Sequence, residues 1–342
     1  MKKTVGIAGA SGYSGGELIA LVSEHPNFEV KYLAASSKVG KEVSELHPHL
    51  AHLNLGTFQE TNAKSLSECD LVFLALPHGA SAELAKQISS DTKIVDLGAD
   101  FRLENASDWA NYYKDAPDHA GTWVYGLSEI VGETVISNAD RVANPGCYAT
   151  AIALGALPML PFVEAEDLVV VAASGTSGAG RSANEKLLAT ELIGSVSSYK
   201  TGGVHQHTPE IEQTLRNASG FDVKVSFTPL LAPMVRGIHA TITGKVKGST
   251  NLDELKNAYQ TKYQGSDFVT ILSESAQPKT SSVVGSNFVQ IQTTIDSHTN
   301  RIITTVVIDN LVKGAAGQAL QNANLMFGFP ATLGLTKIGV AP

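Results

Sequence analysis

Apolar residues in the first 143 positions gather in short continuous runs, and most runs are followed by a turn and a helix-compatible segment. Continuous apolar runs of this length are typical of strands that are buried on both faces. The predicted strands cover residues 4–8, 29–35, 70–76, 93–97 and 135–143. The predicted helices between them cover residues 17–24 and 80–89. Strands that alternate with helices in this way predict a parallel sheet.

The pattern changes beyond residue 160, where extended segments dominate. The predicted strands there cover residues 168–173, 223–231, 237–246, 287–295 and 301–308, and the predicted helices cover residues 184–193 and 252–263. The last two strands alternate apolar and polar positions, and the polar linker 296–300 between them predicts a hairpin. This alternation predicts a largely antiparallel sheet with one covered face. A further helix is expected from Thr208, a preferred N-cap residue, with Pro209 at the first helical position.

Composition describes a globular protein of 342 residues, with 43% hydrophobic and 17% charged positions. The 25 basic and 33 acidic residues give a net charge of −8 without a Lys/Arg cluster, so we expect neither a nucleic-acid nor a membrane partner. No run of about 20 apolar residues could span a bilayer. The first apolar run is broken by glycines too early for a secretory signal. We therefore expect a cytoplasmic protein, in which a few placed cations and backbone donors would bind a small anionic substrate.

The chain offers little for a metal or a disulfide. Cys69 and Cys147 are its two cysteines, too few for a disulfide framework or a Cys-rich metal site. His47, His49 and His52 have a spacing that invites a zinc interpretation, but they lie in a polar segment without nearby Cys or carboxylate ligands. We expect no metal.

A glycine-rich loop follows the first predicted strand directly. Gly9, Gly12 and Gly15 form a G-x-x-G-x-x-G pattern that opens a predicted helix, and strand, glycine loop and helix in this order cradle phosphate in dinucleotide folds. With 31 glycines in the chain the bare pattern is weak, so its position carries the argument, and a plain tight turn is the alternative.

The second strand ends in Ser36, Ser37 and Lys38. An NAD site usually has Asp or Glu at this tip for the ribose 2′-hydroxyl, whereas hydroxyls and a lysine suit a 2′-phosphate. The tip therefore favours NADP over NAD, and a solvated loop is the alternative for Lys38.

These patterns predict an α/β chain of two domains. Residues 1–147, joined by a C-terminal helix at 313–342, would form a Rossmann-type parallel-sheet domain that binds NADP. Residues 148–312 would form an α+β domain with a largely antiparallel sheet, to which the family resemblance assigns catalysis and dimerisation.

Cys147 is the strongest candidate for chemistry. The extended residues 141–143 stop at Asn144-Pro-Gly, a turn signal, and a helix-compatible run covers residues 148–157. Cys147 would thus lie in the first turn of a helix, where unpaired N–H groups and the helix dipole favour the nucleophilic thiolate. A buried structural cysteine is the alternative.

Histidines and arginines supply the remaining candidates. His205 and His207 precede the helix that we expect from Thr208, and one of them would be the general acid/base, because only histidine titrates near neutrality. The alternative is a pair of capping histidines. Arg102 is a candidate anion clamp or an ion-pair partner of nearby Asp100. A second glycine-rich loop ends in Arg181, another possible anion contact.

Five motifs together carry a family resemblance. They are Gly9-Ala-Ser-Gly-Tyr-Ser-Gly15, Asn144-Pro-Gly-Cys147-Tyr, Ser174-Gly-Thr-Ser-Gly-Ala-Gly-Arg181, His205-Gln-His-Thr-Pro-Glu-Ile211 and Asp309-Asn-Leu-Val-Lys-Gly-Ala-Ala-Gly-Gln318. In this order, and over essentially the whole chain, they resemble the N-acetyl-gamma-glutamyl-phosphate reductases of arginine biosynthesis. The aspartate-semialdehyde dehydrogenases share the architecture, but the resemblance to them is looser.

The resemblance implies NADP-dependent reductive dephosphorylation of N-acetyl-gamma-glutamyl phosphate to N-acetylglutamate semialdehyde and phosphate, through a thioacyl intermediate on Cys147. It places the acid/base in the segment of His205 and His207. The implied cofactor contacts are Gly9, Ser11, Gly12, Tyr13, Ser14, Gly15, Ser36, Ser37, Lys38, Pro77, Gly178 and Asn310. The implied substrate-side residues are Arg102, Tyr125, Arg181 and Glu210. We expect a homo-oligomer, a dimer or a tetramer.

Two other functions stay open on the sequence. An aspartate-semialdehyde dehydrogenase would keep the mechanism but act on aspartyl phosphate, whose free ammonium needs a carboxylate partner that the sequence does not identify. A non-catalytic NADP-binding redox sensor would use Cys147 only as a switch, but two histidines and two glycine-rich loops exceed what a sensor requires. The sequence does not distinguish the roles of the two histidines, or those of the two arginines.

Overall fold

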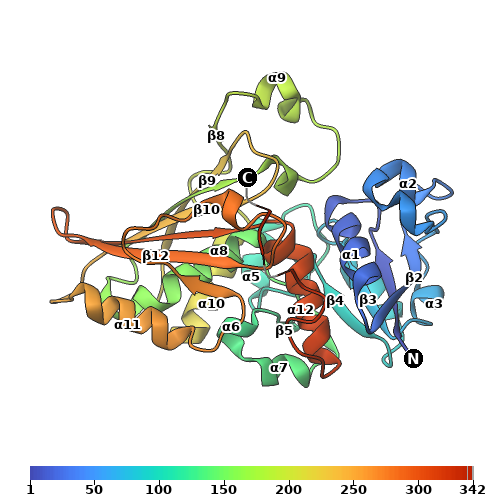
Figure 1. Cartoon of the computed structure of the whole chain (residues 1–342), viewed down its shortest axis with the longest axis horizontal. Helices are drawn as coiled ribbons and strands as arrows, with labels where there is room; N and C mark the ends of the chain where they lie inside the picture. Colours follow the sequence, from blue (N-terminus) through green and yellow to red (C-terminus); the bar gives the residue numbers. More distant parts are fainter. Residues whose placement is uncertain (337, 341–342) are drawn as a thin grey trace. The chain divides into compact units, whose positions relative to one another are not determined.

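The computed structural model describes residues 1–336 and 338–340, apart from the side chain of Lys186. The chain forms two compact units (Figure 1). Unit 1 contains Met1–Pro145 and Ala315–Leu335; unit 2 contains Gly146–Gly314 and the described residues from Thr336 onward. Cys147, which we assigned to the end of the first domain, therefore lies in unit 2. No helix among the described residues is long and apolar enough to cross a membrane.

Unit 1 is built on a parallel sheet of six strands in the order β2-β1-β3-β4-β6-β5. The strands are β1 (Lys3–Ala8), β2 (Phe28–Ala34), β3 (Leu71–Leu74), β4 (Lys93–Asp96), β5 (Val124–Tyr125) and β6 (Arg141–Ala143). All five pairings are parallel, which confirms the predicted Rossmann-type sheet. Strand β3 is buried at every position, because helices cover both faces of such a sheet.

The helices of unit 1 are mostly short. They are α1 (Tyr13–Glu24), α2 (Val43–Leu46), η1 (Pro48–Leu53), α3 (Ala63–Leu66), α4 (Ser81–Gln87), α5 (Ala106–Tyr112), α6 (Ser128–Val131), α7 (Glu133–Ser137) and α12 (Gly317–Met326). Helix α12 is buried along its whole length and packs against α1, α7 and β4. Figure 1 shows α12 (red) and α1 as the longest helices of this unit.

Two sequence predictions in unit 1 are wrong. The strand expected at residues 135–143 is reduced to β6, because residues 133–137 form helix α7, which buries only Ile136. The helix expected at residues 313–342 consists of a π-helical turn, η6 (Val312–Ala316), and α12. It stops at Met326, since Gly328 takes a φ of +70° that ends a helix, and Pro330 follows. Residues 337, 341 and 342 lie outside the described part of the chain.

The chain beyond α12 is anchored by a buried histidine. His25 is fully buried, and its Nε2 lies 3.0 Å from Oδ1 of Asn324 in α12. Its Nδ1 accepts the backbone N–H groups of Asn27 and Phe28. Asn324 in turn donates to the carbonyl of Leu333. Strand β2, helix α12 and residues 331–334 therefore meet at one imidazole.

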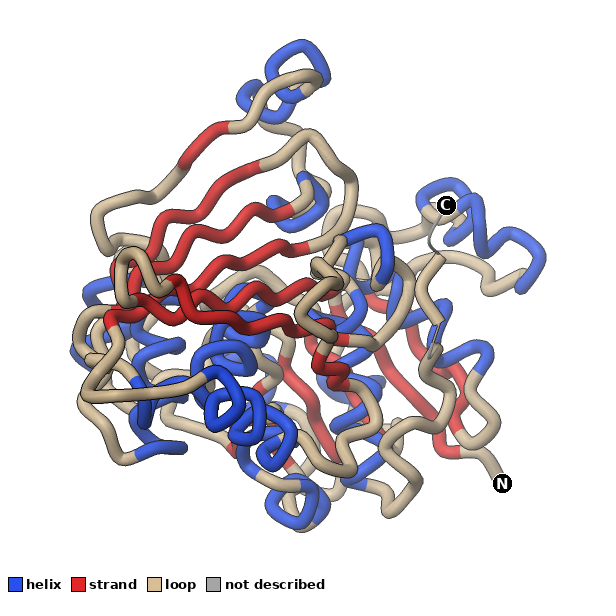
Figure 2. Tube along the Cα trace, turned by 60° about the vertical axis from the view of Figure 1, so that its left-hand side comes forward, coloured by secondary structure: helices blue, strands red, loops and turns tan. Residues whose placement is uncertain are grey.

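Unit 2 is built on a seven-stranded sheet in the order β11-β12-β13-β10-β7-β9-β8. Its strands form the larger row of red segments, on the left of Figure 2. The strands are β7 (Leu168–Ser174), β8 (Ser197–Ser198), β9 (Val225–Leu231), β10 (Ile238–Lys245), β11 (Val269–Ile271), β12 (Val289–Asp296) and β13 (Arg301–Ile308). Among the described strands of this sheet, only β11 with β12 and β7 with β9 pair in parallel. The β12–β13 hairpin closes at Asp296 opposite Arg301, as predicted.

Helices cover one face of this sheet. The helical segments are α8 (Cys147–Ala156), η2 (Leu157–Phe162), η3 (Thr176–Ala179), η4 (Glu185–Leu187), α9 (Ala189–Leu192), α10 (His207–Ser219), α11 (Leu252–Lys262) and η5 (Thr280–Ser282). Helix α8 packs on β10 and β13, α10 on β9, and α11 on β12. Alternate residues on the other face stay accessible, including Val171 at 42% exposure.

Two helix predictions in unit 2 need correction. The amphipathic helix expected at 184–193 is only η4 and α9, and its apolar residues Leu188 and Ile193 are 55% and 79% exposed. Helix α10 begins at His207 instead of after Thr208. His205 accounts for the shift: its Nδ1 accepts the His207 backbone N–H and its carbonyl accepts that of Thr208.

Candidate active site

Cys147 is the first residue of α8 and is partly accessible, whereas the rest of that helix is buried. Gly146 precedes it in an extended conformation, with φ of −69° and ψ of 148°. Gly314 packs against it: a Cβ at position 314 would lie 2.7 Å from Cβ of Cys147. The thiol therefore lies at a helix N-terminus, and the turn after β13 holds its backbone in place.

Glu210 ties the first turn of α10 to this helix N-terminus. Its Oε1 accepts the backbone N–H of Gly146 at 2.7 Å, and only 1% of its surface is exposed. A buried carboxylate that receives a backbone donor makes a strong, charge-assisted hydrogen bond. Because His207 opens the same turn, this bond also fixes the helix that carries the histidine next to the helix that carries Cys147.

The two histidines differ sharply in environment. His205 is 6% exposed, and burial, together with neighbouring His207, lowers its pKa to about 2. Its Nδ1 accepts a backbone N–H, so the neutral ring carries its proton on Nε2. The rings of Tyr148, Tyr199 and Phe227 surround it at 5.1–5.6 Å between centroids. His205 is thus locked in the neutral form.

His207 lies beside this aromatic cluster, with its ring 5.0 Å from that of His205. It is partly exposed, and its ring lies 6.0 Å from that of Tyr148, the residue after Cys147. The Tyr148 hydroxyl donates to the carbonyl of Leu230 and receives that of Tyr199. Burial raises the pKa of Tyr199 to about 12, so both phenols stay neutral.

Asn310 joins two loops of unit 2. Its Oδ1 accepts the backbone N–H of Gly237 at 2.7 Å, and its Nδ2 donates to Oγ of Ser177 in the second glycine-rich loop. Gly178 is exposed in that loop, and Arg181 is exposed just beyond it. The structure therefore brings Asn310, Gly178 and Arg181 into the unit that contains Cys147.

Sequence reasoning missed Arg236. Its Nε lies 3.5 Å from Oδ2 of the fully buried Asp309, beside the Gly237 contact of Asn310. The available signal was that Arg236 directly precedes the predicted strand 237–246. Nothing in the spacing linked Arg236 to Asp309, which lies 73 residues later in the chain.

The first glycine loop in unit 1 is folded tightly. Gly9 has a φ of +82°, and a Cβ there would lie 2.1 Å from the carbonyl oxygen of Ala75. A Cβ at Gly15 would lie 2.4 Å from the oxygen of Gly9, so both positions demand glycine. The loop opens α1, the arrangement that presents backbone N–H groups to a phosphate.

Other predicted residues of unit 1 also follow strand ends. Ser36, Ser37 and Lys38 are exposed beyond β2, Pro77 is exposed beyond β3, and Tyr125 ends β5. Arg102 is only 4% exposed and donates from Nη2 to the carbonyl of Leu97.

Two buried aspartates lie at the end of β4, Asp96 as its last residue and Asp100 just beyond it, and the sequence assigned them no role of this kind. Asp100 accepts the backbone N–H groups of Gly79, Ser81 and Ala82, and so caps α4 from outside the helix. Asp96 accepts from Oγ of Ser81 and from the N–H of Gly98. Burial raises the pKa of Asp96 to about 7.

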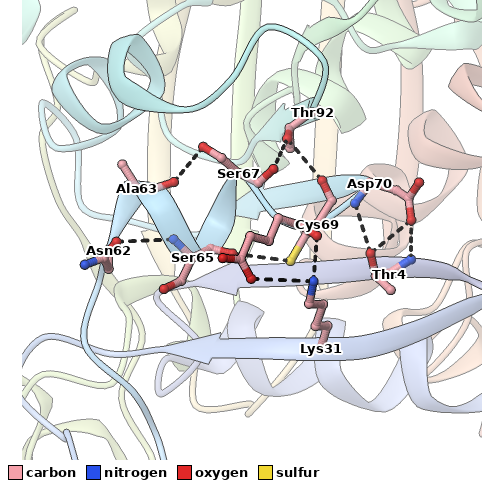
Figure 3. Close-up of polar contacts among 10 residues, drawn as sticks. Thr4, Lys31, Asn62, Ala63, Ser65, Ser67, Cys69, Asp70 and Thr92 are labelled. Carbon is pink, nitrogen blue, oxygen red and sulfur yellow. Dashed lines mark hydrogen bonds and ion pairs between the residues drawn. The ribbon is translucent and has the colours of Figure 1, made fainter.

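Cys69 is a structural cysteine. It is 4% exposed, burial raises its pKa to about 11, and its Sγ donates weakly to the carbonyl of Ser65 (Figure 3). The Cys69 carbonyl accepts from Thr92, and the Asp70 carboxylate accepts both N–H and Oγ1 of Thr4. Of the two cysteines, Cys147 is the accessible one, and it opens a helix whose preceding residue, Gly146, donates its N–H to the Glu210 carboxylate, a position suited to a nucleophile.

Two family models match the chain. Residues 4–138 match the NAD-binding domain of semialdehyde dehydrogenases, and residues 147–310 match their dimerisation domain. Solved structures show the same fold. Aspartate semialdehyde dehydrogenase II from Vibrio cholerae covers 96% of this chain and 99% of its own, with a TM-score of 0.70 at 17% identity. The Candida albicans enzyme with NADP gives a TM-score of 0.65 at 16% identity, over 96% and 99% of the two chains.

Curated relatives are much closer in sequence. The N-acetyl-gamma-glutamyl-phosphate reductase of Acidothermus cellulolyticus is 48% identical, and that of Frankia casuarinae is 49% identical, each over 100% of both chains. At this identity and coverage, and with the Rossmann-type unit and the mostly antiparallel unit both present, the chain belongs to the N-acetyl-gamma-glutamyl-phosphate reductase family.

Proposed function

We propose that this protein catalyses the NADP-dependent reductive dephosphorylation of N-acetyl-gamma-glutamyl phosphate to N-acetylglutamate semialdehyde, in the cytoplasmic synthesis of arginine. The observation that carries the proposal is the placement of Cys147 at the start of α8, with the first turn of α10 joined to it through the Glu210–Gly146 hydrogen bond. The relatives that are 47–49% identical carry the same enzyme name.

Cys147 is the nucleophile in this proposal. Its thiolate attacks the acyl carbon, the C–O bond to phosphate breaks, and a thioester joins the acyl group to Sγ. The N-terminal N–H groups of α8 are suited to stabilise the oxyanion that forms on the carbonyl oxygen. Covalent catalysis of this kind divides one difficult substitution into two easier steps.

His207 is the general acid/base. It takes the proton of the Cys147 thiol and returns it to the sulfur when the aldehyde leaves. His205 is held neutral with a pKa of about 2, so it cannot exchange protons near neutral pH, and we assign it the task of orienting His207. Positioned acid/base catalysis is worth about 10²–10⁴-fold in rate.

The cofactor is NADP, bound by the glycine loop of unit 1, with Ser36, Ser37 and Lys38 at the ribose 2′-phosphate. The strict demand for glycine at positions 9 and 15 fits a loop that a pyrophosphate approaches closely. When bound, the reduced nicotinamide supplies the hydride that converts the thioester to the aldehyde. Pro77 in unit 1, and Gly178 and Asn310 in unit 2, are the further cofactor contacts that we propose.

The substrate anions require cations. We propose Arg181 and Arg102 for the phosphate and carboxylate groups, and Tyr125 as a further substrate contact. Arg181 is exposed and able to meet a ligand, whereas Arg102 is 4% exposed and would act near the Leu97 carbonyl that it already contacts. We also propose a positioning role for Glu210, for which the resemblance implied a substrate contact, because its Oε1 accepts the N–H of Gly146 before α8.

The assembly we propose is a dimer of this chain, formed through the uncovered face of the sheet in unit 2. Val171 on that face pairs with Thr228 and Thr241 of the neighbouring strands, which gives a row of β-branched side chains centred on an exposed valine. The dimerisation domain of the family spans residues 147–310.

The deciding experiment is a phosphate-dependent NADP reduction assay with two aldehydes. N-Acetylglutamate semialdehyde should be oxidised only when phosphate is present, and aspartate semialdehyde at less than about a hundredth of that kcat/KM. Equal or preferred use of aspartate semialdehyde would transfer the chain to the other substrate. No turnover of either aldehyde, with NADP binding retained, would support the redox sensor instead.

A further inference from the structure

His47, in unit 1, is a buried histidine outside the proposed catalytic machinery, and both its ring and its backbone are hydrogen-bonded. His47 is 4% exposed, while His49 and His52 are exposed. Its N–H donates to the carbonyl of Val43, and its carbonyl accepts the N–H of Leu50. The junction of α2 and η1 thus fixes its backbone at both ends.

The His47 ring meets the first glycine loop at two points. Its Nε2 lies 2.9 Å from the carbonyl oxygen of Ala10, and since a carbonyl only accepts, Nε2 is the donor. The ring also fills the space beside Gly16: a Cβ at position 16 would lie 2.5 Å from Cε1 and 2.6 Å from Nδ1 of His47. No larger residue fits at 16 while the ring stays in place.

The bond to Ala10 fixes the direction of a backbone donor. A trans peptide is planar, and within that plane the carbonyl of Ala10 and the N–H of Ser11 point in opposite directions. The N–H groups of Gly9 and Ala10 both donate to the carbonyl of Ala34, which holds the preceding planes. With His47 holding the next carbonyl, the Ser11 N–H is turned away from the imidazole.

We propose that His47 is a positioning residue for the cofactor: by donating to the Ala10 carbonyl and packing on Gly16, it sets the Ala10–Ser11 peptide plane so that the Ser11 N–H faces the pyrophosphate of the bound dinucleotide. This inference rests on the proposed function, because it needs a dinucleotide on this loop. Gly16 is also required, because only glycine at this position leaves room for the His47 ring.

The first test separates the pyrophosphate from the rest of the cofactor. His47→Phe keeps a ring of similar shape and removes the donor. We expect it to weaken NADP and 2′-phospho-ADP-ribose about tenfold, equivalent to about 1.4 kcal/mol. Binding of adenosine 2′-monophosphate, which has no pyrophosphate, should not change, and neither should kcat at saturating NADP. His47→Gln, which retains a side-chain donor, should recover part of the loss, and His52→Ala is the matched control.

A double-mutant cycle tests the packing of the His47 ring against Gly16. Gly16→Ala places a methyl group where the His47 ring lies, so it should weaken NADP binding in the wild-type chain. The same substitution should cost clearly less in a His47→Ala background, where the space is empty, and this non-additivity is the signature of two residues that share one site.

The outcomes are distinct. Wild-type binding of NADP together with unchanged binding by His47→Phe would overturn this inference alone, and so would an equal loss for all three ligands, which indicates general loosening of the unit. Additive effects in the cycle would also overturn it. Failure of the wild-type protein to bind any nicotinamide dinucleotide would instead remove the proposed function, and this inference with it.

Discussion

Two cysteines of identical chemistry show how placement decides reactivity. Cys69 is 4% exposed in the core of unit 1, and burial raises its pKa to about 11. Cys147 is partly accessible at the first position of α8, where the helix N-terminus favours an anion. A similar contrast holds for His205 and His207, two residues apart: His205 is 6% exposed and its surroundings lower its pKa to about 2, whereas His207 is partly exposed.

The two histidines should respond very differently to substitution. His207→Asn should lower kcat about 10²-fold or more, because it removes the proposed acid/base. His205→Asn keeps an acceptor for the His207 N–H and should lower kcat less than about tenfold. Steady-state kinetics from pH 6 to 9 measure both, and equal, mild losses in the two variants would remove the assignment.

Single residues also mark where sequence reasoning stops. The NPGC turn, the glycine loop and the histidine motif were visible in the sequence because their chemistry is local. The hydrogen bonds of Glu210 to Gly146, Asp100 to α4 and His47 to Ala10 join residues 18–64 positions apart, and no spacing rule announces them.

At the scale of elements, helices α8 and α10 pack together and are joined by a hydrogen bond at their N-terminal ends. Glu210 of α10 receives the N–H of Gly146 at 2.7 Å, and Glu212 of the same helix receives that of Val225 at 2.9 Å. Only the first of these bonds reaches the helix that carries Cys147. The pair therefore offers a matched test of whether the Glu210 contact serves catalysis or stability alone.

Glu210→Ala should lower the free energy of unfolding by about 1–3 kcal/mol, because it leaves a buried backbone donor unpaired, and it should also lower kcat. Glu212→Ala should lower stability by a similar or smaller amount without changing kcat. Urea unfolding and single-turnover kinetics measure the two effects. A kcat that is unchanged in Glu210→Ala would make Glu210 a structural residue only.

The contact of α12 with β2 through His25 gives a pH dependence. Burial lowers the pKa of His25 below its ordinary value of 6.5, so below that pH the unfolded chain binds more protons at this ring than the folded chain. The stability contribution of the neutral ring is therefore complete above pH 6.5 and declines as the pH falls. Thermal unfolding between pH 5 and pH 8 should show a shallower acid loss in His25→Gln than in the wild-type protein. An unchanged slope in His25→Gln would contradict this linkage.

Element types followed from sequence patterns more reliably than element boundaries. The continuous apolar runs gave the parallel strands, and alternation gave the β12–β13 hairpin. The errors fell where tertiary contacts decide. The run at 135–143 contains helix α7 because α12 packs on it, and the expected helix at 184–193 breaks into short, exposed pieces.

At the scale of the whole molecule, each unit carries one part of the proposed reaction: unit 1 the dinucleotide loop, unit 2 the nucleophile and the acid/base. The uncovered sheet face of unit 2 belongs to the region that matches the dimerisation domain of the family. The dimer proposal rests on this region and on Val171, which is 42% exposed on that face.

Val171→Asp should therefore weaken the proposed dimer, because it places a charge on the 42%-exposed valine of that face. Val135→Asp alters a valine of 49% exposure in unit 1 and serves as the control. Light scattering coupled to size exclusion measures both masses. A Val171→Asp protein that keeps the wild-type mass across dilution would exclude this face as the interface.

The most direct measurement of the central claim is mass spectrometry of the protein after mixing with N-acetyl-gamma-glutamyl phosphate in the absence of NADPH. The account predicts one added N-acetylglutamyl group on the peptide that contains Cys147, none on the peptide that contains Cys69, and loss of the adduct when NADPH is added. Cys147→Ser should form no thioacyl adduct and turn over no substrate, yet bind NADP as the wild-type protein does. Turnover by Cys147→Ser, or an acyl group on another residue that NADPH discharges, would contradict the account.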